Sequence, residues 1–178
     1  TRARKRNNES AAVETVKQIV MAQEVCRNSR AVDANADGVG ECGDLAQLLA
    51  LPQSPLTVAF AARDNHLFES TGYYFQLWLP DNQCRGVLEM PNPAMAERLW
   101  CVFAWPVARG FTGDRTFFIN QRWLLLENEA GEWGGLDRRP TPDGAFPSSF
   151  ASGRLDQSLS VSEWSTGSVN GWRNVGAH

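Results

Sequence analysis

The sequence predicts a single α+β domain in which one long N-terminal helix packs on an antiparallel β-sheet. Residues 7–30 repeat apolar side chains with a helical period, whereas residues 66–128 hold short aromatic segments bounded by Gly, Pro and Asp. Strands joined by short connections pair antiparallel, and the apolar side of the helix must cover one face of their sheet. With 178 residues, 43% of them hydrophobic, the chain is long enough for one domain with its own core.

The first six residues form a basic arm that contains Arg2, Arg4, Lys5 and Arg6. The whole chain has a net charge of −3, so without these four positive charges residues 7–178 carry −7. Such an acidic body argues against a nucleic-acid-binding domain, and we expect the arm to be a juxtamembrane segment that faces anionic lipid headgroups. A membrane-spanning helix needs ~20 apolar residues in succession, and this sequence contains no such run.

Residues 7–30 predict a long amphipathic helix. The side expected to face the core has the i, i+3, i+4 spacing and consists of Ala12, Val13, Val16, Ile19, Val20, Gln23 and Cys26. Met21 and Val25 interrupt the opposite, polar side. This pattern suits a helix that packs on its own domain with one side and on neighbouring subunits with the other.

Residues 31–65 are predicted to form a loop region with a calcium-like motif. The motif follows the twelve-residue EF-hand loop, and its expected ligands are Asp33, Asn35, Asp37, the backbone carbonyl of Val39, Glu41 and Asp44. Four carboxylates so close together repel one another unless a cation neutralises them. Calcium is therefore the predicted cofactor, at a weak affinity that suits extracellular calcium. In the alternative reading, Asp and Asn form local turns and Asp44 only caps a short helix over 44–50.

The sheet is expected from five segments with strand-like composition, at residues 66–70, 73–79, 99–107, 115–120 and 123–127. Residues 129–178 are rich in Gly, Ser and Pro but contain apolar residues at regular intervals. We interpret them as a long C-terminal tail that wraps the sheet, because a pure linker lacks such apolar residues.

The four cysteines favour two disulfide bonds, Cys26–Cys42 and Cys84–Cys101, because each would close a short loop. Neither pair has the spacing of a zinc site. In the alternative reading all four are buried free thiols. Disulfides would indicate that the protein functions outside the cytoplasm.

No sequence motif indicates an enzyme: the only histidines are His66 and His178, and no phosphate-binding loop or metalloprotease motif occurs. The seven tryptophans suggest a possible sugar-binding surface. Those in predicted strands, Trp78, Trp100, Trp105 and Trp123, are expected to pack in the core or on a face of the sheet. Only Trp133, Trp164 and Trp172 keep the carbohydrate-binding hypothesis open.

Residues 2–23 resemble the segment that follows the membrane-embedded part of type IV pilins and type II secretion pseudopilins. In those proteins an Asn-Glu pair, small residues, Val or Leu with Ile at helical spacing, and a closing Ala-Gln recur, as at Asn8, Glu9, Ile19, Ala22 and Gln23 here. Further blocks are similar to one bacterial branch of pilin-like proteins, at residues 37–41, 70–80, 100–106, 117–121 and 171–173. The resemblance spans nearly the whole chain.

This resemblance implies a pilin-like subunit of a helical surface filament, either a type IV pilus or a type II secretion pseudopilus. The family's membrane-embedded segment is absent from this sequence, so we expect Thr1 to begin a truncated domain. The calcium site of secretion pseudopilins lies in their C-terminal region and does not transfer to the loop at Asp33.

We therefore expect a structural protein of the periplasm or the bacterial cell surface that is anchored in the inner membrane before assembly. Its expected partners are other pilin or pseudopilin subunits. The helix residues expected to serve assembly are Glu9, Val13, Val16, Ile19, Val20, Met21 and Val25. The alternative is a secreted calcium- or carbohydrate-binding module.

Overall fold

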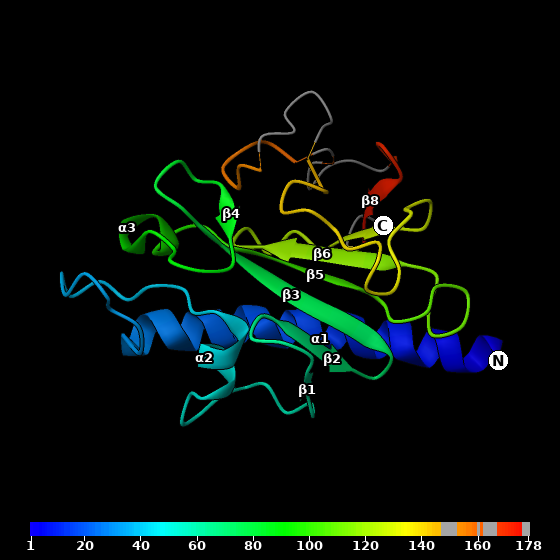
Figure 1. The fold of residues 1–178 in the computed structure, drawn as a ribbon, viewed down its shortest axis with the longest axis horizontal. Coiled ribbons are helices and arrows are strands. Elements are labelled where there is room, and N and C mark those ends of the chain that lie inside the picture. Colours follow the sequence, from blue (N-terminus) through cyan, green and yellow to red (C-terminus); the bar gives the residue numbers. More distant parts are fainter. Residues whose placement is uncertain (147–152, 160, 162–166, 176–178) are drawn as a thin grey trace.

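The fold is seen in a computed structural model that describes residues 1–146, 153–159, 161 and 167–175. Within these ranges the chain forms three helices and eight strands (Figure 1). In chain order they are α1 (Arg2–Ser29), α2 (Leu45–Leu49), β1 (Ala61–Ala62), β2 (Leu67–Ser70), β3 (Tyr73–Pro80), β4 (Gly86–Val87), α3 (Pro93–Ala96), β5 (Cys101–Pro106), β6 (Thr116–Asn120), β7 (Leu126–Asn128) and β8 (Trp172–Asn174).

The helix α1 begins at Arg2 and not at the predicted boundary at residue 7. The Thr1 hydroxyl accepts a hydrogen bond from the backbone N–H of Arg4 and caps the first turn. Arg, Ala and Lys are good helix formers, so nothing in the basic arm stops the helix from extending through it. At the other end Arg30 adopts a left-handed conformation, with φ of 53°, and terminates the helix. The basic arm is thus the first turns of α1.

The strands form one antiparallel sheet in the order β1-β2-β3-β5-β6-β7-β8, with β4 paired to β3. The predicted α+β class, with an N-terminal helix and an antiparallel sheet, is confirmed. Four predicted strands agree with β2, β3, β5 and β6 to within two residues. The fifth is displaced, because Trp123 lies in a turn with φ of 61° and its N–H donates to the Asn120 carbonyl. Sequence reasoning missed α3 and the short strands β1, β4 and β8.

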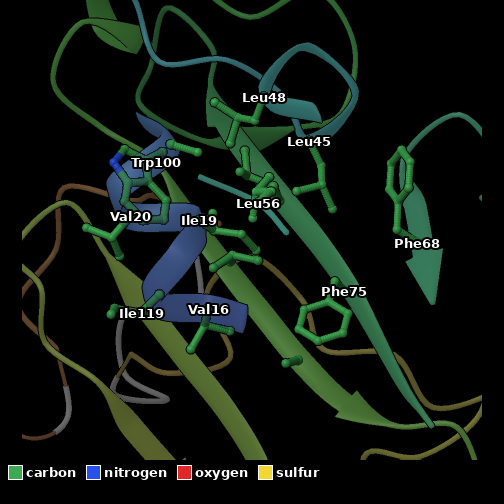
Figure 2. Packing of buried hydrophobic residues seen from close by; sticks show 14 of the residues in the cluster. Val16, Ile19, Val20, Leu45, Leu48, Leu56, Phe68, Phe75, Trp100 and Ile119 are labelled. Carbon is green, nitrogen blue, oxygen red and sulfur yellow. The ribbon is translucent and has the colours of Figure 1, made fainter. Parts of the chain in front are cut away.

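The first hydrophobic cluster, the helix-side core, lies between α1 and one face of the sheet. Figure 2 shows Val16 and Ile19 of α1 directed at Phe75 and Ile119 of the sheet. The helix α2 also contributes to this core, and Asp44 starts it with a capping box in which its carboxylate accepts from the Gln47 N–H. Apart from Val13, which is only partly buried, the predicted i, i+3, i+4 stripe is therefore the buried side of α1.

The second cluster, the tail-side core, lies on the opposite face of the sheet. Strand β5 shows the division most clearly: Val102 and Ala104 belong to the helix-side core, whereas Phe103 and Trp105 belong to the tail-side core. In Figure 1, α1 lies on one side of the sheet and the yellow-to-red segments lie on the other. From these segments the buried residues are Ala145, Phe146, Leu155, Val161 and Trp172.

Among the described residues, no helix has the length and the apolar character needed to cross a membrane.

Candidate functional site

The helix residues expected to serve assembly occupy different surroundings. Val16, Ile19 and Val20 have almost no exposed surface because they pack on the sheet. Glu9 is also buried. The structure places these four in the interior of the domain. Their role in assembly stays a prediction.

The other three assembly positions retain exposed surface. Val13 and Val25 are partly buried against the edge of the helix-side core, and Met21 is 52% exposed. Met21 lies on the outer side of α1 with the exposed residues Glu14 and Lys17, which form an ion pair at 3.0 Å. The outer side of α1 is thus mainly polar with one prominent apolar side chain.

Glu9 ties α1 to the sheet through a chain of ion pairs. Its Oε2 lies 2.8 Å from Nη2 of Arg115, and its Oε1 accepts from the backbone N–H of Asp114 at 2.9 Å. Arg115 also donates from Nη1 to Glu127 Oε2 at 2.7 Å. Glu127 in turn pairs with Arg173 of β8. One buried carboxylate of the helix is therefore linked through Arg115 to β7 and β8 by alternating charges.

The pKa of Arg115 reflects these neighbours. Partial burial disfavours its charge, but the hydrogen bonds and charges of Glu9 and Glu127 outweigh that effect and raise the pKa. The guanidinium stays charged at any physiological pH. It serves as a permanent bridge between two buried carboxylates.

The connection between β5 and β6, residues 107–115, is fixed to the N-terminal half of α1. Lys5 Nζ lies 2.6 Å from Asp114 Oδ2, and the Asn8 side chain donates to the Thr112 carbonyl at 2.9 Å. With the contacts of Glu9, three side chains within about one and a half turns of the helix hold this connection.

The same connection also requires a glycine. A Cβ atom on Gly113 would lie 2.1 Å from the hydroxyl oxygen of Tyr73, so no larger residue fits there. The Tyr73 hydroxyl donates to the Arg115 carbonyl at 2.9 Å, and burial raises the pKa of Tyr73. The connection is therefore packed tightly on the end of the sheet.

A groove of about 800 Å³ separates the start of α1 from this connection. We call it the N-terminal groove. Its walls include Arg2, Lys5 and Arg6 from α1 and Phe111 and Arg115 from the connection. Two other hollows among the described residues are smaller, at about 260 and 200 Å³.

Sequence reasoning missed the partners of Glu9, although one signal pointed to them. Glu9 lies three and seven residues before Ala12 and Val16, on the buried side of the helix. A carboxylate on such a side needs a cation or several N–H donors. The identity of that cation, Arg115, follows only from the strand register.

The loop at Asp33 closes through its own hydrogen bonds. Glu41 Oε1 accepts from the Ala34 N–H at 2.8 Å, and Asp33 Oδ2 accepts from the Gly38 N–H at 3.2 Å. A Cβ on Gly40 would lie 2.0 Å from the Arg27 carbonyl oxygen, so the loop fits closely against the end of α1. These contacts match the local-turn interpretation.

The other residues expected to bind calcium also take part in local hydrogen bonds. Asp37 Oδ1 accepts from the Val39 N–H at 2.8 Å, and Asn35 donates to Asp37 at 2.9 Å. Asp44 caps α2. Among the described residues no group of three or more His, Cys, Asp or Glu side chains could hold a metal ion. Calcium binding stays a prediction.

The four cysteines all lie in described parts of the chain and are free. Cys26 and Cys42 are both buried in the helix-side core, and burial raises the pKa of Cys42 to about 12. Cys84 Sγ contacts Met95 Sδ at 3.7 Å, whereas Cys101 Sγ faces the Pro142 carbonyl on the tail side. The disulfide pairs stay a prediction, and thiol counting tests them.

The tryptophans expected to bind carbohydrate are placed differently from the expectation. Trp172 is 1% exposed, and the Trp133 ring packs on it with centroids 5.4 Å apart. Trp164, like His178, lies outside the described residues. The expected core position of Trp123 is wrong, because its side chain is 55% exposed. No pair of stacked, exposed tryptophans forms a sugar-binding surface in the described ranges.

No family model matches this chain, and neither a curated protein nor a solved structure was found to be similar to it.

Proposed function

We propose that this chain is the globular domain of a pilin-like filament subunit that assembles through the outer side of α1. The observation that carries the proposal is the division of this 28-residue helix into two sides, with a buried side that runs from Asn8 to Cys26. One side belongs to the core of the domain, and the opposite side is free for neighbours.

The length of α1 supports an assembly role. At 1.5 Å per residue, the helix spans about 42 Å, and it runs along the long axis of the molecule with its N-terminal end at one extremity (Figure 1). A helix in this position can lie beside equivalent helices of other subunits, while the sheet and the tail-side segments face outward.

The chemistry of the outer side fits a contact made by many copies of one chain. Glu14 and Lys17 offer opposite charges to neighbouring helices, and Met21 offers a flexible apolar side chain. The partly buried Val13 and Val25 extend this apolar surface. These three apolar residues, and not the enclosed Val16, Ile19 and Val20, are the proposed assembly contacts.

In vivo photo-crosslinking tests this proposal in the full-length gene product. A photoreactive amino acid at position 21 should give a ladder of crosslinked multimers in the organism that carries the gene. The matched control is position 90, because Met90 is also an exposed methionine, at 92%, and precedes α3 at the opposite end of the molecule from the start of α1.

The proposal also requires that deletion of the gene abolish or alter a surface or periplasmic filament. Equal ladders from positions 21 and 90 would indicate non-specific aggregation. A ladder from position 90 alone would assign assembly to another surface and contradict the role of α1.

A further inference from the structure

The N-terminal groove combines unpaired positive charge with an exposed aromatic side chain. Its acidic residues are each neutralised: Glu9 by Arg115, Asp114 by Lys5, and Glu129 by Arg173. In the described parts of the chain, Arg2, Arg4 and Arg6 form no salt bridge. Among the described residues, these three guanidinium groups therefore have no carboxylate partner.

Positive charge is concentrated in the first turns of α1. The first turn has no acidic residue, and four of the first five residues of the helix are Arg or Lys. Arg2 and Arg6 are four residues apart, and like charges at that spacing repel each other on a helix. An anion bound beside them would relieve this repulsion.

Phe111 adds an apolar group to the same groove. It is 80% exposed at the tip of the connection between β5 and β6. That connection is held by Lys5, Asn8 and Glu9, so Phe111 has a defined place beside Arg2 and Arg6. An exposed aromatic ring among cations is the arrangement by which peripheral proteins enter the interface of an anionic bilayer.

We propose that the N-terminal groove docks the domain on an anionic phospholipid surface. Arg2 and Arg6 contact lipid phosphates, and Phe111 inserts among the headgroups. This inference goes beyond the proposed assembly function, because it gives the folded domain a membrane contact of its own. It also adds a binding groove and an apolar anchor to the juxtamembrane role expected for residues 1–6.

The shape of the molecule explains why an acidic protein can bind an anionic surface. The start of α1 lies at one extremity of the molecule (Figure 1), and the acidic loop at Asp33 follows the other end of this helix of about 42 Å. Screening in physiological salt extends over only ~8 Å, so the distant carboxylates have little influence on this contact. A long nucleic acid would meet more of the acidic body, and one exposed phenylalanine is a poor stacking platform for successive bases.

Vesicle flotation of the 178-residue chain tests the proposal. The chain should float with vesicles that contain roughly one-third phosphatidylglycerol at about 0.1 M salt, and not with vesicles of phosphatidylcholine alone. Each basic residue near an anionic surface contributes about fivefold in binding. The double variant R2S/R6S should therefore bind roughly 20-fold more weakly.

The matched charge control is R98S/R122S. Both residues are exposed, and the register places them at the other end of the sheet, since Cys101 pairs with Asn120. This control removes the same two charges and should retain binding within about twofold, because it lies beyond the screening length. The apolar anchor is tested by Phe111→Ser, which should weaken binding to the vesicles about fivefold. Its control is Met90→Ser, which removes another exposed apolar side chain and should leave binding unchanged.

Three outcomes would overturn the proposal: equal binding to both kinds of vesicle, equal losses for the two charge variants, or no loss for Phe111→Ser. Stronger binding to duplex DNA than to vesicles, with the same dependence on Arg2 and Arg6, would reassign the groove to nucleic acid. The crosslinking test of assembly is separate, because a ladder from position 21 does not require the groove. Either proposal can thus fail without the other.

Discussion

The two faces of the sheet are covered in different ways. On the helix-side face, α1 supplies aliphatic residues at regular spacing, such as Val16 and Ile19. On the tail-side face, irregular segments supply aromatic residues, and both buried indoles donate to backbone carbonyls. Trp105 Nε1 donates to the Gly135 carbonyl and Trp172 Nε1 to the Gly144 carbonyl, each at 2.9 Å.

The difference follows from where backbone hydrogen bonds are made. A helix satisfies its own N–H and C=O groups, so it can cover a sheet with mainly apolar side chains. An irregular segment leaves carbonyls that need donors from elsewhere, and buried tryptophans supply both the apolar area and the donor. The tail-side core should therefore tolerate loss of a polar atom less well than the helix-side core.

The largest effect is expected from Trp172→Ala, which should lower the free energy of unfolding by about 3–5 kcal/mol. It creates a cavity beside Phe103 and Phe118 and leaves the Gly144 carbonyl without its donor. Urea unfolding measures this loss. The control Trp123→Ala removes an exposed indole and should change stability by less than ~0.5 kcal/mol. A loss below ~1 kcal/mol for Trp172→Ala would show that the tail-side cover is not part of the cooperative fold.

Ile19→Ala should give the next largest loss, about 2–4 kcal/mol, because it leaves a cavity under α1 without an unpaired polar group. Ile19→Val should cost about 0.5–1.5 kcal/mol. Combining Ile19→Ala with Trp172→Ala sharpens the comparison, since additive losses in one transition mean two independent contacts in one cooperative domain. Two separate transitions would mean that the faces unfold independently.

Glu9→Gln should lower the free energy of unfolding by about 1–3 kcal/mol, because it removes a charge-assisted hydrogen bond from the buried link to Arg115. The control is Glu14→Gln, an exposed partner of Lys17, which should have an effect below ~0.5 kcal/mol. Thermal or urea unfolding distinguishes the two. Equal small effects would show that the ion-pair chain does not hold α1 to the sheet.

Calcium should have a smaller effect if the loop at Asp33 binds it. For a dissociation constant near 1 mM, about 2 mM calcium adds ~0.6 kcal/mol to the free energy of unfolding. Comparing melting temperatures with calcium and with chelator measures this gain, and Asp37→Asn should remove it. No change in the unmodified chain at millimolar calcium would refute the predicted site.

The last prediction concerns the rates at which the four cysteines react with an alkylating reagent in the native protein. Burial raises the pKa of Cys42 to about 12 and also raises that of Cys26, so both thiols should react slowly at about pH 8. Cys84, the only one of the four that is not fully buried, should react first. Mass spectrometry follows each site, and unfolding without reductant should expose four reactive thiols, or none if both predicted disulfides form.

The sequence predicted the helix-side half of the fold well because its signals are local. The stripe from Ala12 to Cys26 repeats within one helix, and Asp44 and Gln47 lie within one turn of the cap that they form. The tail-side half of the fold was harder to predict. Trp172 looked like a loose surface residue, because its contacts with Phe103 and Phe118 depend on segments that are distant in sequence.

The candidate sites divide in the same way. Glu9 could be marked from its position on the buried side of the helix, but its partner Arg115 follows only from the strand register. Phe111 gave no sequence signal, since a single aromatic residue in a loop is ordinary. Its proposed role follows from the contacts of Lys5 and Asn8 with the connection between β5 and β6, which place Phe111 beside Arg2 and Arg6.

By itself, the sequence determined the α+β class, the amphipathic helix and the separation of a basic end from an acidic body. These features follow from periodicity and charge, which depend only on residues that are close in sequence. Only the tertiary structure decided which helix residues remain free, which carboxylates are paired and which aromatic residue is exposed. Burial and pairing depend on contacts between distant segments, and those contacts exist only once the chain has closed around both faces of the sheet.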